Sequence, residues 1–235
     1  MKLSTFAVIL ATCLFNLFLW DLSNKPVDLD GSTYPVASIS LNPYQRYQDP
    51  FGGHTPTLED MTRDVELLVG KTKAIRLYSA REGLDKVTEL AAKHRIAITG
   101  GAWLDHRLEN NRLELDSLIA MAKKFKNVKR ALVGNETQLH GAVPYELLIS
   151  YLDEARRSLN IPVSTAEPWD YWLEHPELAK HVDFIAIHVL PYWVDVPAQS
   201  ETGESAVEYV LKRYEAVKRA FPQKHVVISE TGWPS

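Results

Sequence analysis

The chain has 235 residues, of which 46% are hydrophobic and 24% charged, a balance that excludes a disordered or fibrous protein and favours one large globular domain. Its formal net charge is -4, its sequence pI is near 6.1, and no run rich in Lys and Arg occurs, so nucleic acid is not an expected partner. Cys13 is the only cysteine and lies in the apolar N-terminal segment, which excludes disulfides and thiolate metal sites from the folded part.

The N-terminal segment predicts export from the cytoplasm. Lys2 precedes Phe6 to Trp20, 15 mostly apolar residues that are typical of an export signal. No small-x-small cleavage site follows Trp20, so an uncleaved signal anchor competes with a removed signal peptide, and we slightly favour the anchor. The shortness of the run argues against the anchor, because a spanning helix needs about 20 apolar residues. A buried core helix is less expected at an extreme N-terminus.

Charges around this segment predict the side of the membrane on which the rest of the chain lies. Lys2 precedes the apolar run and three aspartates follow it, Asp21, Asp28 and Asp30, which places the remainder outside the cytoplasm. We therefore expect a cell-membrane protein whose folded domain, residues 31–235, faces the periplasm or the cell exterior, with secretion as the alternative. Residues 1–30 would form the signal segment and a short linker.

Seven short runs rich in apolar and β-branched residues are predicted to be buried parallel strands. They are Val36–Leu41, Ala74–Tyr78, Ile96–Thr99, Lys129–Val133, Pro162–Ala166, Phe184–Val189 and Val226–Ser229. Amphipathic helical patterns lie between them, and Thr57 with Asp60 resembles a capping box before the first. Three apolar stripes are predicted: Leu115, Leu118, Ile119, Ala122 and Phe125; Leu148, Tyr151, Leu152, Ala155 and Leu159; and Val207, Val210, Leu211, Tyr214 and Val217.

The alternation of strands and helices predicts an α/β architecture, a parallel sheet covered by helices. No phosphate-binding glycine fingerprint occurs, and seven repeated units favour a (β/α)8 TIM barrel over a dinucleotide-binding fold. Because the chain stops at Ser235, directly after the seventh strand, we expect a barrel truncated after that strand. Two strands would then keep unpaired edges, so these residues are expected to fold poorly on their own.

Glu136 and Glu230 each end a strand-like run, and together they are the ingredients of a two-carboxylate glycosidase. One carboxyl delivers a proton to the leaving oxygen, while the other stabilises or captures the oxocarbenium-like centre. Both would lie at the C-terminal mouth of the barrel, where ideal geometry leaves about 5 Å between the carboxyls, the spacing of a retaining mechanism. Their matching positions disfavour the alternative of two ordinary solvated charges. Residues 135–137 also form an N-glycosylation sequon, which we treat as coincidence because the inner mouth is poorly accessible.

Aromatic residues gather at the same predicted strand ends, where their faces could stack on sugar rings. They are Tyr44, Tyr78, Trp103, Trp169, Tyr192 and Trp193, together with Trp233 beside Glu230. Any single one is more often a packing residue, and Tyr78, Tyr192 and Trp233 are the first choices for substrate binding. His188 could bind a hydroxyl or orient a glutamate, although a satisfied core histidine is the commoner role. The eight histidines show no His-x-His or HExxH spacing, so neither a metal nor another cofactor is expected. No Gly-x-Ser-x-Gly occurs, so a Ser or Cys nucleophile elbow is not expected either.

Two motifs resemble those of glycoside hydrolase family 17, the β-1,3-glucanases and glucanosyltransferases: Val133-Gly134-Asn135-Glu136 and Ile228-Ser229-Glu230-Thr231-Gly232-Trp233-Pro234-Ser235. The similarity runs from about Val36 to Ser235. Residues 167–169 and 188–193 resemble the bacterial branch, whose members are often attached to the membrane and fused to a glycosyltransferase. The resemblance implies that Glu136 is the acid/base and Glu230 the nucleophile, and that Asn135 binds near the 2-hydroxyl of the sugar linked to the nucleophile. The family's eighth strand has no counterpart here.

The sequence therefore predicts a retaining glycoside hydrolase that acts on β-1,3-glucan polysaccharide or oligosaccharide through a covalent glucosyl-enzyme. The first alternative is a transglycosylase attached to a glucan-synthesising glycosyltransferase domain in the same full-length chain. The second is a noncatalytic glucan-binding module, which the presence of both carboxylates disfavours.

Overall fold

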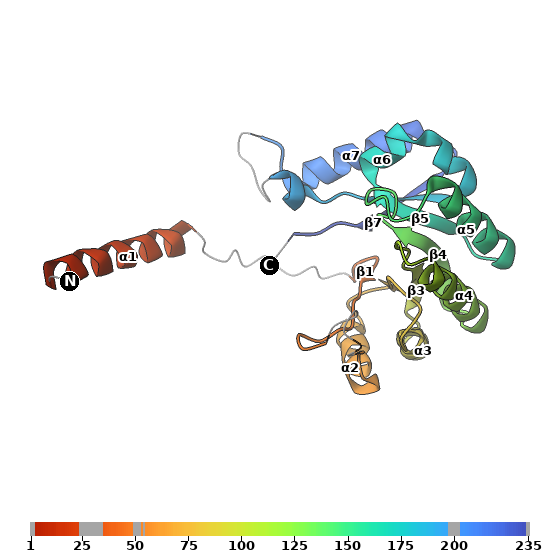
Figure 1. Ribbon diagram of the computed structural model, residues 1–235, viewed down its shortest axis with the longest axis horizontal. Helices are drawn as coiled ribbons and strands as arrows, with labels where there is room; N and C mark the ends of the chain where they lie inside the picture. Colours follow the sequence, from red (N-terminus) through yellow and green to blue (C-terminus); the bar gives the residue numbers. More distant parts are fainter. Residues whose placement is uncertain (1–2, 24–34, 49–52, 54, 197–202, 234–235) are drawn as a thin grey trace. The chain divides into compact units, whose positions relative to one another are not determined.

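A computed structural model describes residues 3–23, 35–48, 53, 55–196 and 203–233 of the chain (Figure 1). The chain divides into two compact units, Met1–Tyr34 and Pro35–Ser235. The predicted domain boundary, between residues 30 and 31, lies outside the described residues.

In the first unit the structure describes one helix, α1 (Leu3–Ser23). Its stretch Ser4–Leu22 is long and apolar enough to cross a membrane, a property that a signal sequence near an N-terminus shares. The polar side chains of Thr12 and Asn16 bond to the helix itself, since Thr12 Oγ1 donates to the Val8 carbonyl and Asn16 Nδ2 donates to the Thr12 carbonyl. These bonds lower the cost of placing both groups in lipid. The helix therefore fits a signal peptide or a membrane anchor, and its exposed side chains give no support to a buried core helix.

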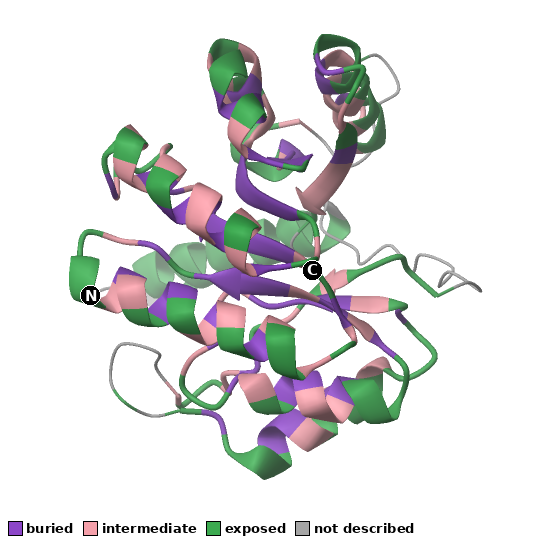
Figure 2. Ribbon diagram, turned by 90° about the vertical axis from the view of Figure 1, so that its right-hand side faces the viewer, coloured by how far each residue is buried: buried purple, intermediate pink, exposed green. Residues whose placement is uncertain are grey.

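The second unit is built on one parallel sheet with its strands in chain order. The strands are β1 (Ile39–Ser40), β2 (Ala74–Arg76), β3 (Ala97–Ala102), β4 (Val128–Asn135), β5 (Val163–Pro168), β6 (Phe184–His188) and β7 (His225–Glu230). Parallel strands in chain order with helices between them are the arrangement of a (β/α)8 barrel, and the sheet is curled in this way (Figures 1 and 2). In the described part of the chain, β1 and β7 stand at opposite ends of the strand order, which confirms the predicted partial barrel of seven strands.

Helices connect the strands and cover one face of the sheet. They are α2 (Leu58–Leu68), α3 (Asp85–Lys93), α4 (Leu108–Lys124), α5 (Tyr145–Ser158), α6 (Trp169–Glu174) and α7 (Ala206–Ala220), with the 3-10 helices η1 (Pro176–His181) and η2 (Pro191–Val194). The predicted capping box before α2 is confirmed, because the side chains of Thr57 and Asp60 each accept the other's backbone N–H. A second box, formed by Ser205 and Glu208, begins α7 and was not predicted.

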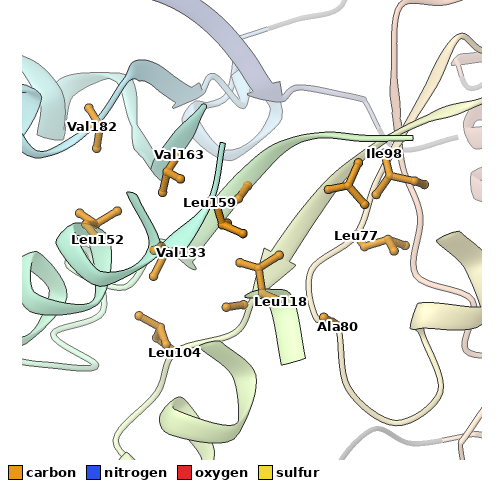
Figure 3. Close-up of a cluster of buried hydrophobic side chains, with 14 of the residues drawn as sticks. Leu77, Ala80, Ile98, Leu104, Leu118, Val133, Leu152, Leu159, Val163 and Val182 are labelled. Carbon is orange, nitrogen blue, oxygen red and sulfur yellow. The ribbon is translucent and has the colours of Figure 1, made fainter. Parts of the chain in front are cut away.

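Buried aliphatic side chains between the sheet and its helices form the main core. Figure 3 shows this cluster, which includes Leu77, Ile98, Leu118, Val133, Leu152, Val163 and Val182. The stripes predicted for α4 and α5 are confirmed, since Leu115 and Leu118 on α4 and Leu148 and Leu152 on α5 are fully buried. Each such side chain contributes roughly 1.5–3 kcal/mol by leaving water, which fixes both helices against the sheet.

The stripe predicted for α7 is only partly right. Val217 is buried and Val210 and Tyr214 pack against the core, but Val207 and Leu211 are exposed. The inward face instead carries Tyr209, Arg213 and Val217, which are four residues apart, and the Arg213 guanidinium lies 4.0 Å from the centre of the Tyr209 ring. A pattern of apolar residues misses an arginine that packs through its planar face.

All seven strands differ from their predicted bounds, and β1 and β3 differ most, each by three residues at one end. β1 begins later than predicted, because Val36 forms only an isolated bridge with Thr72. β3 continues to Ala102, and a Cβ on Gly101 would lie 2.2 Å from the Leu77 carbonyl oxygen. Glycine at this position therefore allows β2 and β3 to approach closely near the end of the sheet that carries the polar residues.

Candidate active site

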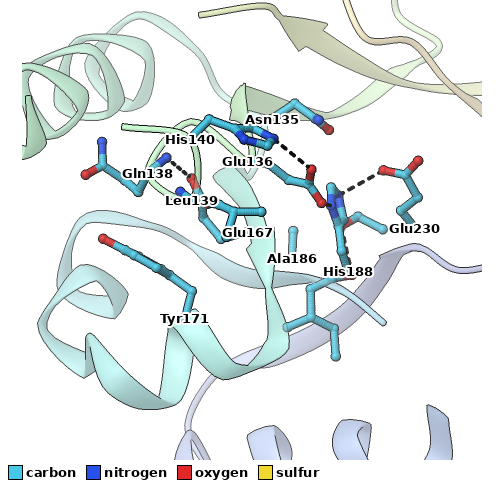
Figure 4. A network of polar contacts seen from close by, with 12 residues as sticks. Asn135, Glu136, Gln138, Leu139, His140, Glu167, Tyr171, Ala186, His188 and Glu230 are labelled. Atoms are coloured by element: carbon cyan, nitrogen blue, oxygen red, sulfur yellow. Dashed lines mark hydrogen bonds and ion pairs between the residues drawn. The ribbon is translucent and has the colours of Figure 1, made fainter. Parts of the chain in front are cut away.

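Polar side chains from four strands meet at the carboxyl ends of the sheet, and Figure 4 shows those from β4, β6 and β7. They are Arg76 of β2, Asn135 and Glu136 at the end of β4, His188 of β6 and Glu230 of β7. Parallel strands end at one edge, so residues far apart in the sequence come together there. The structure thus brings together both predicted glutamates, Asn135 and His188, and adds an arginine that the sequence analysis did not select.

A bulge in β7 turns Glu230 toward the inner face of the sheet, the face opposite the helices. Ile228 pairs with Ile187, but the next residue of β6, His188, pairs with Glu230, so Ser229 is the extra residue. Because side chains alternate along a strand, regular pairing would have put Ser229 beside His188 and turned Glu230 toward the helices. The bulge instead places the Glu230 carboxylate next to the imidazole.

A second irregularity changes the direction in which the side chains at the end of β4 point. Between Leu132 and Asn135, β4 advances three residues while β5 advances two. Gly134 lies within this bulge at φ +92°, a conformation that favours glycine. Asn135 therefore faces inward, and Glu136, at φ +50°, begins the turn that leaves the strand.

We predict that Gly134→Ala destabilises the fold and reduces activity. A Cβ at this position would lie 2.5 Å from Thr137 Oγ1, and the left-handed backbone alone costs an alanine about 1–2 kcal/mol. Gly141→Ala is the matched control, because Gly141 also has positive φ (+57°) but a Cβ there would meet nothing within 4 Å. Urea unfolding and turnover should show a larger loss of both in the first variant, and equal losses in the two would contradict the steric argument.

His188 lies between the two carboxylates and is only 2% exposed. Its Nδ1 is 2.7 Å from Glu136 Oε1, a hydrogen bond, and its Nε2 is 3.3 Å from Glu230 Oε2. The second contact is at ion-pair distance without hydrogen-bond geometry, so Nε2 has no hydrogen-bond partner within the described structure. The hydrogen bond from His188 lowers the pKa of Glu136, against the opposing effect of burial, and the exposed His140, 3.4 Å away, acts in the same direction as His188.

Arg76 and Tyr78 hold the Glu230 carboxylate from the other side. Tyr78 Oη donates to Glu230 Oε1 at 2.8 Å, and Arg76 Nη1 lies 3.3 Å from Oε2 and donates to the Ser229 carbonyl at 3.0 Å. Arg76 Nη2 also donates to Asn135 Oδ1, so one guanidinium ties β2, β4 and β7 together. Burial, assisted by the charge of Glu230, raises the pKa of Tyr78, which keeps the phenol a proton donor.

Two buried charged residues were missing from the predicted site. Arg76 is 4% exposed and Glu167 is 0% exposed, although such residues are seldom buried without a partner. Each interrupts an apolar strand pattern, Arg76 within the second predicted strand and Glu167 directly after the fifth. That interruption, next to a strand's carboxyl end, was the signal available in the sequence.

A cavity of about 440 Å³ opens beside Tyr78. Its lining includes the predicted aromatic residues Tyr44, Tyr78 and Trp103, with Asp105 and Arg107. Tyr78 thus contacts the Glu230 carboxylate and also borders this cavity. An aromatic wall with charged groups at its edge is a typical binding surface for a polar ring such as a sugar.

A cluster of three exposed rings follows β6 and β7. The ring centres of Tyr192 and Trp233 are 5.5 Å apart, and those of Tyr192 and Trp193 are 5.6 Å apart, with edge-to-face geometry in both pairs. Trp193 is 75% exposed. Trp169, by contrast, packs against the core and lies under the Arg213 guanidinium at 5.3 Å, contacts typical of a packing residue. Within the described ranges, no group of three or more His, Cys, Asp or Glu side chains is placed to hold a metal ion.

Residues 38–235 match the family described as the BtgE/BtgC glycoside hydrolase domain. Among curated relatives, a "Probable glucan endo-1,3-beta-glucosidase btgC" of Aspergillus terreus is 28% identical over 199 residues, which are 77% of this chain and 30% of the relative. The protein of the same description from Aspergillus flavus is 27% identical and is covered over 28% of its length. The chain thus spans less than a third of these relatives.

Solved structures support the same fold. A glycoside hydrolase family 17 β-1,3-glucanosyltransferase from Rhizomucor miehei has a TM-score of 0.71 and 24% sequence identity, with 85% of this chain and 72% of that chain covered. An active-site mutant of the Rhizomucor miehei enzyme in complex with laminaritriose gives the same TM-score at 23% identity. At this level of identity the likeness concerns the arrangement of strands and helices.

Proposed function

This chain belongs to the BtgE/BtgC glycoside hydrolase domain family, and we propose that it cleaves β-1,3-glucan with retention of configuration, using Glu230 as nucleophile and Glu136 as acid/base. The observation that carries this proposal is the arrangement of both carboxylates on the two nitrogens of one buried imidazole, that of His188. Two carboxylates that meet at the mouth of a barrel are what a two-carboxylate glycosidase requires, and retention is the outcome that the resemblance to glycoside hydrolase family 17 implies. The relatives named for action on 1,3-β-glucan support the substrate class.

In the first step, a Glu230 oxygen attacks the anomeric carbon while the bond to the leaving sugar oxygen breaks. Glu136 gives its proton to that oxygen, so the leaving sugar departs as an alcohol and Glu230 becomes a glucosyl ester. Tyr78 and Arg76 hold the attacking carboxylate in one orientation before reaction. Arg76 also engages Asn135 Oδ1, which leaves the Asn135 amide N–H groups to donate toward the 2-hydroxyl of the bound sugar.

In the second step, water or another sugar hydroxyl attacks the glucosyl ester. Glu136, now a carboxylate, accepts the proton of the attacking hydroxyl, and Glu230 leaves as a carboxylate. The hydrogen bond from His188, which lowers the pKa of Glu136, suits this base role. A glucan that covers the mouth would exclude water from Glu136 and raise its pKa, which suits the acid role.

Transglycosylation is the second candidate, and the exposed cluster of Tyr192, Trp193 and Trp233 favours it. Exposed aromatic rings beside the nucleophile's strand could hold an acceptor sugar in place of water. The cavity lined by Tyr44, Tyr78 and Trp103 would then hold a different part of the glucan. A noncatalytic glucan-binding module remains the third candidate.

We further propose that α1 exports the chain, so that the barrel acts on glucan outside the cytoplasm, either anchored to the membrane or secreted. The curated relatives named above are fungal. Membership of a bacterial branch and an attached glycosyltransferase domain therefore stay predictions, as does any activity of the whole protein.

Mass spectrometry of products from defined β-1,3-gluco-oligosaccharides tests this proposal on the full-length chain. We expect new oligosaccharides with the wild type and none with Glu230→Gln. Products that are all shorter than the input would indicate a hydrolase, whereas products longer than the input would indicate a glucanosyltransferase. Unchanged oligosaccharides, despite measurable binding, would overturn the enzymatic proposal in favour of a binding module.

A further inference from the structure

Glu167 is a fully buried carboxyl that the proposed reaction steps do not use. It lies near the end of β5 and reaches the turn that follows β4 (Figure 4). Its Oε1 accepts the Gln138 N–H at 2.9 Å, and its Oε2 accepts the Leu139 N–H at 3.3 Å. Both donors belong to the turn that begins with Glu136, so one side chain of β5 fastens the segment that carries the proposed acid/base.

Other contacts of this turn show how far its position depends on β5. The Glu136 N–H donates to the Ala166 carbonyl at 2.7 Å, directly before Glu167 in the strand. Glu136 itself has φ +50°, a backbone conformation that a glutamate holds only where its surroundings enforce it. The carboxyl of Glu167 accepts two of the bonds that do so, at the second and third residues beyond Glu136.

The charge of Glu167 faces two titratable groups, Glu136 from the turn after β4 and Tyr171 from α6. Burial raises the pKa of Glu167 to about 7, against the opposing effect of the Gln138 and Leu139 N–H groups, and the negative charge of Glu136 raises it further. Burial, assisted by the charge of Glu167, also raises the pKa of Tyr171 to about 12, so this phenol stays neutral. His188 lowers the pKa of Glu136, so Glu136 is already ionised when Glu167 titrates, and the titration of Glu167 mainly changes its capacity to accept the two N–H groups.

We propose that Glu167 is a positioning residue, which holds the Glu136 turn against β5. The proposal rests on the acid/base role proposed above. An ionised carboxylate accepts both N–H groups, whereas a protonated carboxyl has less capacity to accept them.

Glu167→Gln in the full-length chain tests the proposal, because glutamine keeps the shape but loses the charge and turns an N–H₂ group toward one N–H donor. We expect kcat on β-1,3-gluco-oligosaccharides to fall about 10-fold or more, with KM changed by less than about 3-fold. Glu167→Asp keeps a carboxyl acceptor and shortens its reach without turning an N–H group toward either donor, so it should lower kcat less than Glu167→Gln, and it replaces the glutamine variant if that variant does not fold.

Asp183→Asn is the matched control, since Asp183 Oδ2 accepts the Val163 N–H at 2.9 Å near the opposite end of β5. It should lower the melting temperature without lowering kcat. If Glu167→Gln lowers the melting temperature but leaves kcat unchanged, Glu167 only packs and the proposal is wrong.

A readout that needs no activity separates this inference from the proposed function. Amide hydrogen exchange at Gln138 and Leu139 should be at least about 10-fold faster in Glu167→Gln than in Asp183→Asn. Unchanged exchange overturns the anchoring even if the wild type is active. If the wild type leaves glucans unchanged but exchange at Gln138 and Leu139 is still faster in Glu167→Gln, the anchoring is supported and only the proposed function is contradicted.

Discussion

Glu230→Gln is expected to abolish turnover of β-1,3-glucan while the protein continues to bind it. The substitution replaces the carboxylate oxygens that would form the glucosyl ester, and an amide is far too weak a nucleophile to substitute for them. The loss in kcat should be on the order of 10⁴-fold or more, the size seen when enzymes with covalent intermediates lose their nucleophile. Tyr78 can still donate to the remaining Oε1, so the glucan surface should keep its shape.

Calorimetric titration with a gluco-oligosaccharide, alongside a turnover assay, measures the two halves of this expectation. Glu215→Gln is the control, because Glu215 is an exposed residue of α7 and the change in charge is the same. We expect that variant to match the wild type in both assays. Near wild-type turnover in Glu230→Gln would sink the nucleophile assignment, and loss of binding without loss of fold would show that Glu230 mainly holds the sugar.

Positions along strands explain why both glutamates could be predicted from the sequence. Parallel strands end at one edge, so a glutamate after the fourth apolar run and another after the seventh must approach each other in a barrel. The prediction required only the alternation of strands and helices, which the structure confirms strand by strand. It required no knowledge of the side-chain contacts at Glu136 or Glu230.

The side-chain contacts of Glu136 and Glu230 depend on bulges in β4 and β7, which the alternation of side chains along a strand does not predict. Regular pairing would have turned Glu230 toward the helices, and only the extra residue Ser229 brings it beside His188. At the end of β4 the signal was a glycine, Gly134, whose positive φ accompanies the bulge. Bulges arise from the balance of backbone strain and side-chain contacts in three dimensions, so a periodic reading of one strand cannot locate them.

Arg76 shows a second limit of sequence reasoning. In an apolar strand a lone arginine suggests an edge or an irregularity, whereas here it is buried because its guanidinium reaches Glu230, the Ser229 carbonyl and Asn135. A buried charge is tolerated only with such partners, and the partners lie more than fifty residues away in the sequence. The same reasoning applies to Glu167, whose N–H donors come from the neighbouring strand's turn.

Glu136→Ala is expected to affect substrates according to their leaving groups. A natural glucan leaves as a poor alkoxide unless it is protonated, so its kcat/KM should fall about 10²- to 10⁴-fold. An activated aryl glucoside needs little protonation, and its kcat/KM, which reports the steps through formation of the glucosyl-enzyme, should fall far less. The second step also loses its base, so the glucosyl ester should accumulate and kcat for the aryl glucoside should become limited by its attack by water.

Azide provides a direct check on that second step, because it attacks the glucosyl ester without giving up a proton and can enter the space vacated by the side chain. It should raise kcat of Glu136→Ala on the aryl glucoside and yield a β-glucosyl azide, while leaving the wild type almost unaffected. Glu136→Gln is the matched control, since it fills the space and cannot transfer a proton, and it should be slow on glucan without rescue by azide. Equal slowing of glucan and aryl glucoside would instead mean that Glu136 positions the substrate, and the proton donor would have to be sought elsewhere among the groups around His188.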